Sequence, residues 1–215
     1  MALKVYDFRN DEHLCQMLVT PQIRCRFMEV PVGQEHGAPH SHDLGHEIFL
    51  ILQGQCEFVI SGQKAVLGPG QLCVALVDEP HTIRNVGDEK VIMYLSVTPH
   101  IQPTHTDRQD DGSPKPPRFA PSESYGIETD ATTPADQLVD GFVSAAAEYS
   151  RAQREIADRQ AELAAQLKAA LAAEDREQVT ACRDQLWDGV RSGFEQIHAL
   201  GYLWNTLGPR ISYFD

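Results

Sequence analysis

The sequence predicts a mainly β domain that is followed by an α-helical hairpin. Over about the first 106 residues, short apolar runs alternate with glycine, proline and asparagine, which is typical of short strands joined by turns. From Pro134 onward, apolar residues recur every three or four positions, the spacing of one face of a helix. The stretch between them has neither spacing. We therefore expect three parts: a β-barrel over residues 1–106, an extended connector over residues 107–133 and a helical hairpin over residues 134–215.

The β part divides into apolar runs that have the length of single strands. Ser61-Gly62 stands between two of these runs, and such a pair is typical of a two-residue hairpin turn. Many short strands at close spacing predict a β-sandwich or a small barrel. The runs cover residues 23–30, 47–52, 56–60, 65–67, 72–77 and 91–97.

The connector is rich in proline and in polar residues. Five prolines fall between Gln102 and Asp130, together with several aspartates, serines and threonines. Proline fixes φ and has no backbone N–H, so such a stretch favours an extended chain. We expect it to lie along the surface or to reach a partner subunit.

Two helices are expected after the connector. Thr133 is a suitable N-cap for the first, with Pro134 as its first helical residue. Asp175 and Gln178 can form a capping box for the second, which leaves residues 172–174 as the turn. The apolar stripe contains much alanine, so the helices can pack closely on each other or on another subunit. Its positions are Leu138, Phe142, Ala145, Tyr149, Ala152, Ile156, Leu163 and Leu167, then Val179, Cys182, Leu186, Val190, Phe194 and Ile197.

The chain is strongly acidic, with a formal net charge of −13 from 31 acidic and 18 basic residues. Such a surface repels phosphate backbones and anionic lipid headgroups, which argues against nucleic acid and membranes as partners. The helical part holds 13 acidic and eight basic residues, so neither helix resembles a basic DNA-recognition helix. Cationic or neutral small molecules, or a metal ion, remain as partners.

The N-terminal residues and the cysteines indicate a cytoplasmic protein. Met1 is followed by no apolar segment of the kind found in secretory signals, and no apolar run approaches the roughly 20 residues that span a bilayer. The five cysteines are scattered, odd in number and never in CxxC spacing, which is typical of reduced thiols. A cysteine that faced the barrel interior could contact a substrate, although the spacing selects none.

A first group of candidate site residues begins at His40. His40 and His42 are separated by one residue, and both point to one face of a strand because side chains alternate. Glu47 follows His42 after four residues, and a bend through residues 43–45 can return it beside the histidines. Gly54 follows after six more.

A second group lies toward the end of the β part. Gly70 is followed after ten residues by His81, which is followed after three more by Asn85. A strand that carries His81 through the same barrel interior would bring it to the first group.

Together the two groups resemble the motifs of the cupin superfamily, in its single-domain form. The first motif, HxH(x)4E(x)6G, is matched at every fixed position from His40 to Gly54. The second usually reads G(x)5PxG(x)2H(x)3N, and here its first glycine, its histidine and its asparagine are matched. Leu76 stands where proline is usual and Asp78 where glycine is usual, which affects the turn before His81 more than the ligands. The resemblance covers about half of the chain.

The resemblance implies a double-stranded β-helix, or jelly-roll barrel, which is usually dimeric and binds one divalent metal through three histidines and a glutamate. On this chain the implied ligands are His40, His42, Glu47 and His81. Three neutral imidazoles and one carboxylate suit Fe(II), Mn(II), Ni(II), Cu(II) or Zn(II). Four protein ligands on a six-coordinate ion leave two positions for water, oxygen or a chelating substrate.

Three further histidines lie close to these motifs. His46 precedes Glu47 and is an alternative ligand, although strand alternation and the step to Gly54 favour Glu47. His100 and His105 lie at the end of the last strand. They either fold back over the barrel mouth, where they would face a substrate or the ligands, or occupy surface turns, which is the commoner case.

The site predicts one leading function and one alternative. The leading expectation is a metal-dependent enzyme on a small organic molecule, with oxygenase chemistry ahead of isomerase or lyase chemistry, assembled as a homodimer. The alternative is a non-catalytic cupin that binds a metal or ligand for sensing and assembles through its helices. A solvent-connected pocket favours the enzyme, and a closed barrel favours the alternative. The residues in register with the ligands, which we expect to give the barrel apolar walls, are Phe49, Ile51, Phe58 and Ile83.

Overall fold

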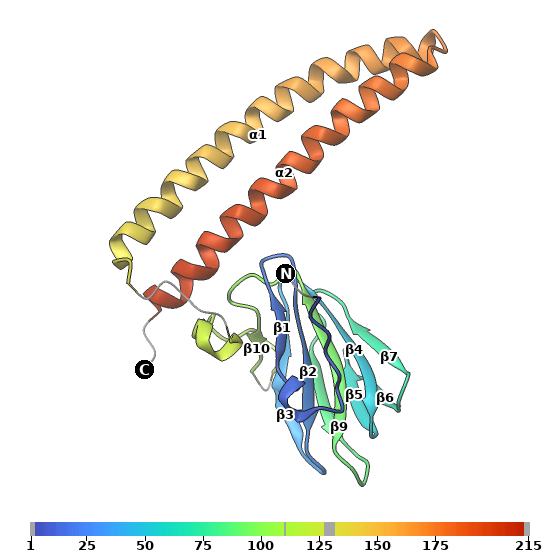
Figure 1. Cartoon of the computed structure of the whole chain (residues 1–215), viewed down its shortest axis with the longest axis vertical. Helices are drawn as coiled ribbons and strands as arrows, with labels where there is room; N and C mark the ends of the chain where they lie inside the picture. The colour runs from blue at the N-terminus through green and yellow to red at the C-terminus, as the bar shows by residue number, and fades with distance from the viewer. Residues whose placement is uncertain (1–2, 110, 127–131, 213–215) are drawn as a thin grey trace. The chain divides into compact units, whose positions relative to one another are not determined.

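Ten short strands among the described residues form two antiparallel sheets, as the computed structural model shows (Figure 1). The structure describes residues 3–109, 111–126 and 132–212. They fall into two compact units, one made of Met1–Asp130 with Gly208–Asp215 and the other of Ala131–Leu207. The first unit contains both sheets, and the second contains most of the helical hairpin.

The first sheet has the strand order β1-β2-β9-β4-β7, and the second has the order β10-β3-β8-β5-β6. Consecutive strands from β2 to β5 alternate between the two sheets, which is the connectivity of a jelly roll, as expected from the motifs. The strands are β1 Gln16–Val19, β2 Arg24–Val30, β3 Glu35–Ser41, β4 His46–Gln53, β5 Cys56–Ile60, β6 Gln63–Leu67, β7 Leu72–Ala75, β8 His81–Asn85, β9 Val91–Thr98 and β10 Thr106–Asp107. Two 3-10 helices, η1 (Asp11–His13) and η2 (Ser122–Tyr125), precede and follow them.

The hydrophobic core lies between the two sheets. The four residues expected to line the barrel are all at most 2% exposed, which confirms that expectation. Burying a large apolar side chain of this kind stabilises the fold by about 1.5–3 kcal/mol. The core cluster consists of Met28, Val30, Phe49, Ile51, Cys56, Phe58, Leu67, Ala75, Ile83, Val91, Met93, Leu95 and Val97.

Two positive backbone angles explain two glycines of the β part. The turn between β5 and β6 consists of Ser61 and Gly62, with φ of 49° and 78°. Positive φ at both central residues defines a type I′ turn, whose twist matches that of the strands. Gly54, the last residue of the first motif, has φ of 78°, and a Cβ there would lie 2.9 Å from the carbonyl oxygen of Lys90. Glycine alone fits this position without a backbone shift.

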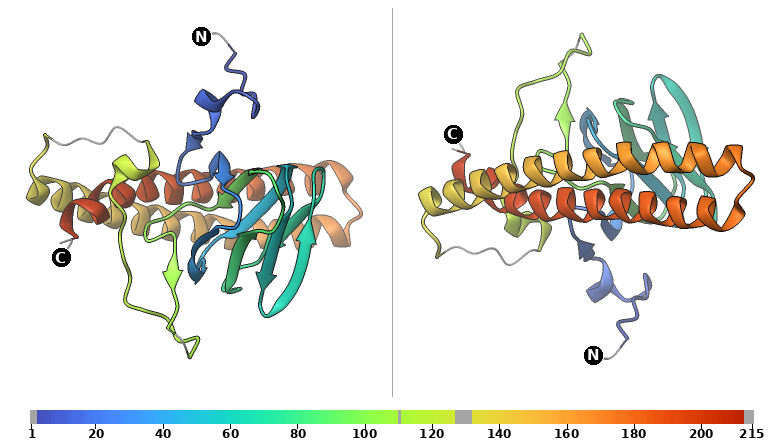
Figure 2. Two further views of the ribbon diagram at one scale, coloured as in Figure 1. Left: turned by 90° about the horizontal axis from the view of Figure 1, so that it is seen from below. Right: turned by 90° about the horizontal axis from the view of Figure 1, so that it is seen from above.

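The second unit is built from two long antiparallel helices that lie side by side, α1 (Ala135–Ala172) and α2 (Arg176–Ile211) (Figures 1 and 2). Asp175 caps α2, because its Oδ1 accepts a hydrogen bond from the backbone N–H of Gln178 at 3.0 Å. This cap and the short turn before it agree with the sequence pattern, but the return half of the expected capping box is not formed. The side chain of Gln178 instead contacts Sγ of Cys182, and the backbone N–H of Asp175 donates to the carbonyl oxygen of Ala170.

The start of α1 differs from the expectation. Pro134, not Thr133, occupies the N-cap position, and no side chain caps the helix there. Pro134 has ψ of 143°, which is outside the helical range, so the helix begins one residue later. The prediction of Thr133 as the N-cap is therefore wrong.

The hairpin buries a narrow set of small and apolar residues. Leu163 and Ala170 of α1 and Cys182 of α2 are at most 5% exposed. Near the open end, the rings of Phe142 and Trp204 lie 5.5 Å apart between their centroids. No helix in the described part of the chain is both long enough and apolar enough to span a membrane.

Candidate metal centre

Opposing positions of the two sheets direct the candidate residues into the barrel. In the first sheet, Glu47 of β4 and Arg24 of β2 flank the same residue of β9. In the second sheet, His40 of β3 pairs directly with His81 of β8. Residues at one level of a sheet point to one side, so these side chains enter the interior together. His42 lies just after β3, two residues beyond His40.

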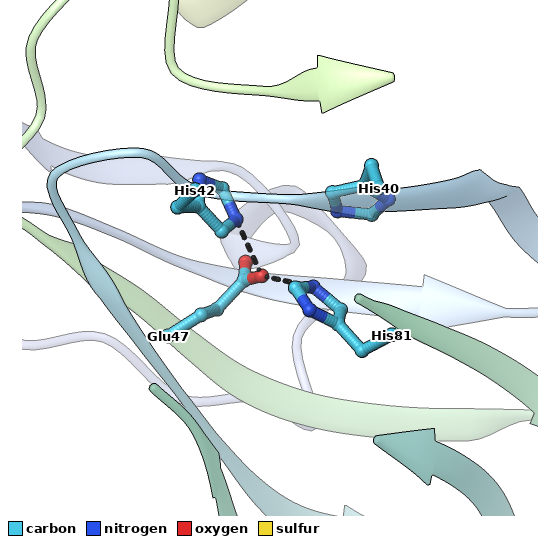
Figure 3. A group of neighbouring side chains, drawn as sticks. All are labelled: His40, His42, Glu47 and His81. Atoms are coloured by element: carbon cyan, nitrogen blue, oxygen red, sulfur yellow. Dashed lines mark hydrogen bonds and ion pairs between the residues drawn. The ribbon is translucent and has the colours of Figure 1, made fainter. Parts of the chain in front are cut away.

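The four residues expected as ligands lie together in the barrel (Figure 3). Each offers one ligand atom, and these atoms all lie within 4.8 Å of one another. The Oε2 atom of Glu47 is 2.8 Å from Nε2 of His42 and 2.9 Å from Nε2 of His81. The four side chains are buried, from 2% exposed for His42 to 9% for His40.

Backbone carbonyl groups fix the orientation of the three imidazoles. His40 Nδ1 donates to the carbonyl oxygen two residues before it at 3.0 Å, and His81 Nδ1 does the same at 2.9 Å. His42 Nδ1 donates to the carbonyl oxygen of Thr104. A carbonyl oxygen can only accept, so each Nδ1 carries a proton. In a neutral imidazole the lone pair is then on Nε2.

Acceptor atoms therefore converge where His42, His81 and Glu47 meet. An ionised carboxylate also only accepts, so close approach to two Nε2 lone pairs requires a proton or a cation between them. Burial raises the pKa of Glu47, whereas a proton on the imidazoles of His42 and His81 that faces its carboxylate holds the pKa well below the ordinary value, and a bound cation would act in the same direction. Burial, and then the neighbouring His81, lower the pKa of His40 to about 4. Neutral imidazoles and an ionised carboxylate are the forms that bind a divalent metal, so the donor set fits such an ion.

Two guanidinium groups beside the cluster were missed by the sequence interpretation. Arg24 is 3% exposed, and its Nη2 lies 4.0 Å from Oε1 of Glu47. Arg26 lies one level further along β2, with its Nη2 3.4 Å from Nε2 of His36. Burial, and then Arg24, lower the pKa of Arg26. Both occupy inward positions of the run 23–30, so strand alternation was the signal that could have identified them.

Residues 99–107, which we call the closing segment, lie over the ligand cluster. The ring of His105 is 4.9 Å, between centroids, from the ring of each histidine of the first motif. Its Nδ1 lies 3.0 Å from Oγ1 of Thr104, and this hydroxyl lies 3.1 Å from the hydroxyl of Tyr125. Burial, followed by the two adjacent histidines, lowers the pKa of His105 to about 2. The neutral form of His105 therefore packs on His40 and His42.

Tyr125, which belongs to the expected connector of residues 107–133, contacts the closing segment. It is 6% exposed, and its ring lies 5.0 Å from that of His100 and 5.1 Å from the guanidinium carbon of Arg24. His100 is 1% exposed, and its backbone N–H donates to the carbonyl oxygen of Pro21. Of the two positions considered for His100 and His105, the structure shows the one over the barrel. No spacing in the sequence marked Tyr125.

Comparison with known proteins identifies the β part. Residues 26–98, which include all four expected ligands, match the family model described as "Cupin domain". This part of the chain is a cupin domain.

Individual relatives are similar to this cupin domain over part of their length. The pectin degradation protein KdgF of Dickeya dadantii (strain 3937) is 32% identical over 57 residues, which are 26% of this chain and 52% of that protein. The chain thus spans about half the length of the curated relative that it matches. A structure of a conserved double-stranded β-helix protein from Klebsiella pneumoniae is 23% identical, with a TM-score of 0.41 over 45% of this chain and 84% of that one. KdgF from a Halomonas species is 24% identical, with a TM-score of 0.35 over 45% and 78%.

Two further residues of the motif segments of this cupin domain, His46 and Asp78, lie outside the group of four candidate ligands. His46 is exposed, and its Nδ1 accepts a hydrogen bond from the backbone N–H of Val77 at 3.1 Å. It alternates with Glu47 along β4 and so points away from the cluster. Asp78, at the usual glycine position, has φ of 62°, a left-handed conformation that glycine adopts most readily and aspartate tolerates. His81 still reaches the cluster three residues later.

The two cysteines nearest the core of the cupin domain are not candidate nucleophiles. Burial raises the pKa of Cys56 and of Cys73 to about 12. Both thiols are therefore protonated at neutral pH, and the thiolate is the reactive form. Cys15, Cys25 and Cys182 are also free.

Proposed function

We propose that this cupin domain binds one divalent metal ion through His40, His42, Glu47 and His81. The convergence of Nε2 lone pairs on an ionised, buried carboxylate supports this more than any other observation, because a cation removes the repulsion between these acceptors. The donor set suits Fe(II), Mn(II), Ni(II), Cu(II) or Zn(II). When bound, such an ion supplies Lewis acidity or the capacity to activate oxygen.

We also propose that the domain is an enzyme that acts on a small organic molecule. The cluster is buried, and burial alone favours a non-catalytic metal module. Two features favour an enzyme: a metal with a purely structural role needs neither the guanidinium of Arg24 nor the non-ligand imidazole of His105 beside it. The similarity to a pectin degradation protein favours the enzyme as well.

Oxygenase chemistry is favoured over isomerase or lyase chemistry. Phe49 packs beside the ligands, with its ring 5.7 Å from that of His81 between centroids, and the closing segment covers them. An apolar, water-excluding site protects reactive species from hydrolysis and from stray protons. Within the site, Arg24 is positioned to bind a polar group of the substrate, and the neutral imidazole of His105 is positioned to form a hydrogen bond with the substrate beside the ligands.

The proposed oxygenase activity is tested by measuring oxygen uptake by the Fe(II)-loaded full chain with each of a panel of small phenols and keto acids. An oxygenase consumes oxygen in step with substrate, and His81→Ala abolishes this whereas His46→Ala, a change of the exposed histidine next to Glu47, retains it. Substrate turnover without oxygen in the Zn(II)- or Mn(II)-loaded chain would assign isomerase or lyase chemistry instead. Metal binding without turnover of any compound would favour the non-catalytic sensing module.

A further inference from the structure

Beside the candidate ligands, the barrel interior contains the guanidinium groups of Arg24 and Arg26 and the carboxylate of Glu47. Arg24 and Arg26 both point inward from β2, and Glu47 is the carboxylate that the structure places against Arg24. The inference about Arg24 rests on the proposed metal site. Once a divalent ion binds Glu47, the negative charge of this carboxylate no longer neutralises the guanidinium of Arg24. Two arginine side chains and a divalent ion then share the interior with one carboxylate.

Such an excess of charge is costly in a buried site. An ionised group removed from water requires a counter-charge and hydrogen-bond partners, and the loss of one partner of a buried pair leaves the other charge uncompensated. Arg24 is 3% exposed, and its Nε has no hydrogen-bond partner among the described residues. The Nε atom of Arg26 also has none in that part of the chain. Buried N–H donors normally form a hydrogen bond, so a bound acceptor is expected at the Nε–H groups of Arg24 and Arg26.

The surroundings of Arg24 select the shape of this acceptor. The ring of Tyr125 lies 5.1 Å from its guanidinium carbon and so covers one face of the group. The N–H groups along the edge, Nε with a terminal nitrogen, form a planar fork that matches the two oxygens of a carboxylate. At the next level of the sheet, the buried side chains of Leu95 and Phe49 pack in the barrel interior beneath Arg24 and Glu47, which favours a small anion over a large one.

We propose that Arg24, assisted by Arg26, binds the carboxylate of a small organic acid whose second oxygen donor reaches the metal. The substrate of the domain is therefore an anion of the 2-oxo or 2-hydroxy acid type, because a donor beside the carboxylate can chelate the ion. Arg24 sets the orientation of the acid, and the closing segment lies over it.

The test uses the full chain loaded with Co²⁺, whose visible spectrum reports a change of ligand at the metal. Pyruvate, oxalate, the neutral amide pyruvamide and inorganic phosphate are titrated in turn. The acids are expected to bind, and pyruvamide to bind at least about tenfold more weakly, the loss that follows from an ion pair worth roughly 1.4 kcal/mol.

Variants of Arg24 distinguish the contribution of its guanidinium geometry from that of its charge and from an effect on folding. Arg24→Gln is expected to weaken pyruvate binding at least tenfold, roughly 1.4 kcal/mol, with Co²⁺ content unchanged. Arg24→Lys keeps the positive charge but loses the planar guanidinium, so its affinity for pyruvate is expected to lie between those of the wild type and Arg24→Gln. Arg84→Gln is the matched control, because Arg84 is exposed on the outer face of β8 and its loss changes the net charge equally. Circular dichroism and the melting temperature establish that each variant is folded.

Each other outcome overturns the proposal. Equal affinity for pyruvate and pyruvamide, or an Arg24→Gln variant that binds pyruvate like the wild type, removes the carboxylate site. Tighter binding of phosphate than of either acid assigns a phosphate group instead. If the wild type takes up no Co²⁺, the metal proposal fails by itself. In that case the thermal shift that pyruvate gives the metal-free wild type and Arg24→Gln decides whether Arg24 binds a carboxylate.

Discussion

At the scale of single residues, three hydrogen bonds to backbone carbonyl groups determine what the cluster can bind. They place a proton on Nδ1 of His40, His42 and His81, so that each Nε2 presents a lone pair. The spacing of the two motifs was enough to predict that the four candidate ligands lie together. It contains no information on these carbonyl partners, one of which, Thr104, lies 62 residues from His42 in the sequence.

The buried imidazole of His100 predicts a loss of stability in acid. Burial, then Arg24 and His42, lower its pKa from the ordinary 6.5 to about 3. The unfolded chain therefore binds a proton as the pH falls through about 6.5, whereas the folded chain does so only near pH 3. The contribution of neutral His100 is complete above pH 6.5 and is lost progressively below it.

Urea unfolding of the metal-free protein between pH 6.5 and 4 measures this effect. We expect His100→Gln to reduce the slope of the free energy of unfolding against pH by up to about 1.4 kcal/mol per pH unit, the value for one proton. His13→Gln, at an exposed 3-10 helix, serves as the control. An unchanged slope in His100→Gln would show that His100 is not held neutral by the fold.

Two glycines with the same φ separate backbone strain from steric contact. Gly54 and Gly62 both have φ of 78°, but a Cβ at Gly54 meets the backbone of Lys90 and Val91, whereas a Cβ at Gly62 meets nothing within 4 Å. Gly62→Ala is expected to cost about 1–2 kcal/mol from the left-handed conformation alone. Gly54→Ala should cost about 1–3 kcal/mol more, because the backbone must move. Equal losses in chemical denaturation would contradict the steric account.

At the scale of elements, alternation along the strands explains both the core and the site. Inward positions are apolar at one end of the barrel and carry the ligands and arginines at the other. The sequence was sufficient for six of the ten described strands, the hairpin turn, the two helices and the grouping of the four candidate ligands, because all of these depend on local spacing. It was insufficient for the contact between Arg24 and Glu47, which lie on different strands, and for Tyr125, which follows a stretch without any period.

The closing segment is expected to depend on the hydroxyl of Tyr125. This group forms a hydrogen bond with Oγ1 of Thr104, which in turn contacts His105. Tyr125→Phe removes about 1 kcal/mol of local stability and should speed amide hydrogen exchange in the closing segment about fivefold. Tyr149→Phe in α1 changes a tyrosine of the other unit and is expected to leave this exchange unaltered. Equal exchange in Tyr125→Phe and the wild type would mean that the segment is held by its backbone pairing alone.

At the scale of the whole molecule, the exposed side of α2 bears on the expected homodimer. Trp187, Val190, Phe194 and Ile197 follow one another at helical spacing and are 40–62% exposed. Contiguous apolar surface of this kind is typical of an interface, and a second copy of the chain is the partner that the cupin resemblance implies. The homodimer stays a prediction.

Light scattering on the purified chain tests the predicted homodimer. The molar mass of the wild type in solution should be about twice that of the 23.9 kDa chain, and the molar mass of Phe194→Glu should equal that of a single chain. Ala181→Glu adds the same charge at an exposed position on another side of α2 and should leave the dimer intact. A monomeric wild type, or dimers in both variants, would contradict assembly through this stripe.

The metal content of the purified protein tests the central claim most directly. Elemental analysis after reconstitution should find about one divalent ion per chain in the wild type and in His46→Ala, in which only the exposed neighbour of Glu47 is changed. His42→Ala and His81→Ala should each hold at least about tenfold less, since each loses one of four ligands. A wild type without bound metal, or one whose metal content equals that of His42→Ala and His81→Ala, would contradict the assignment of this cluster as a metal centre.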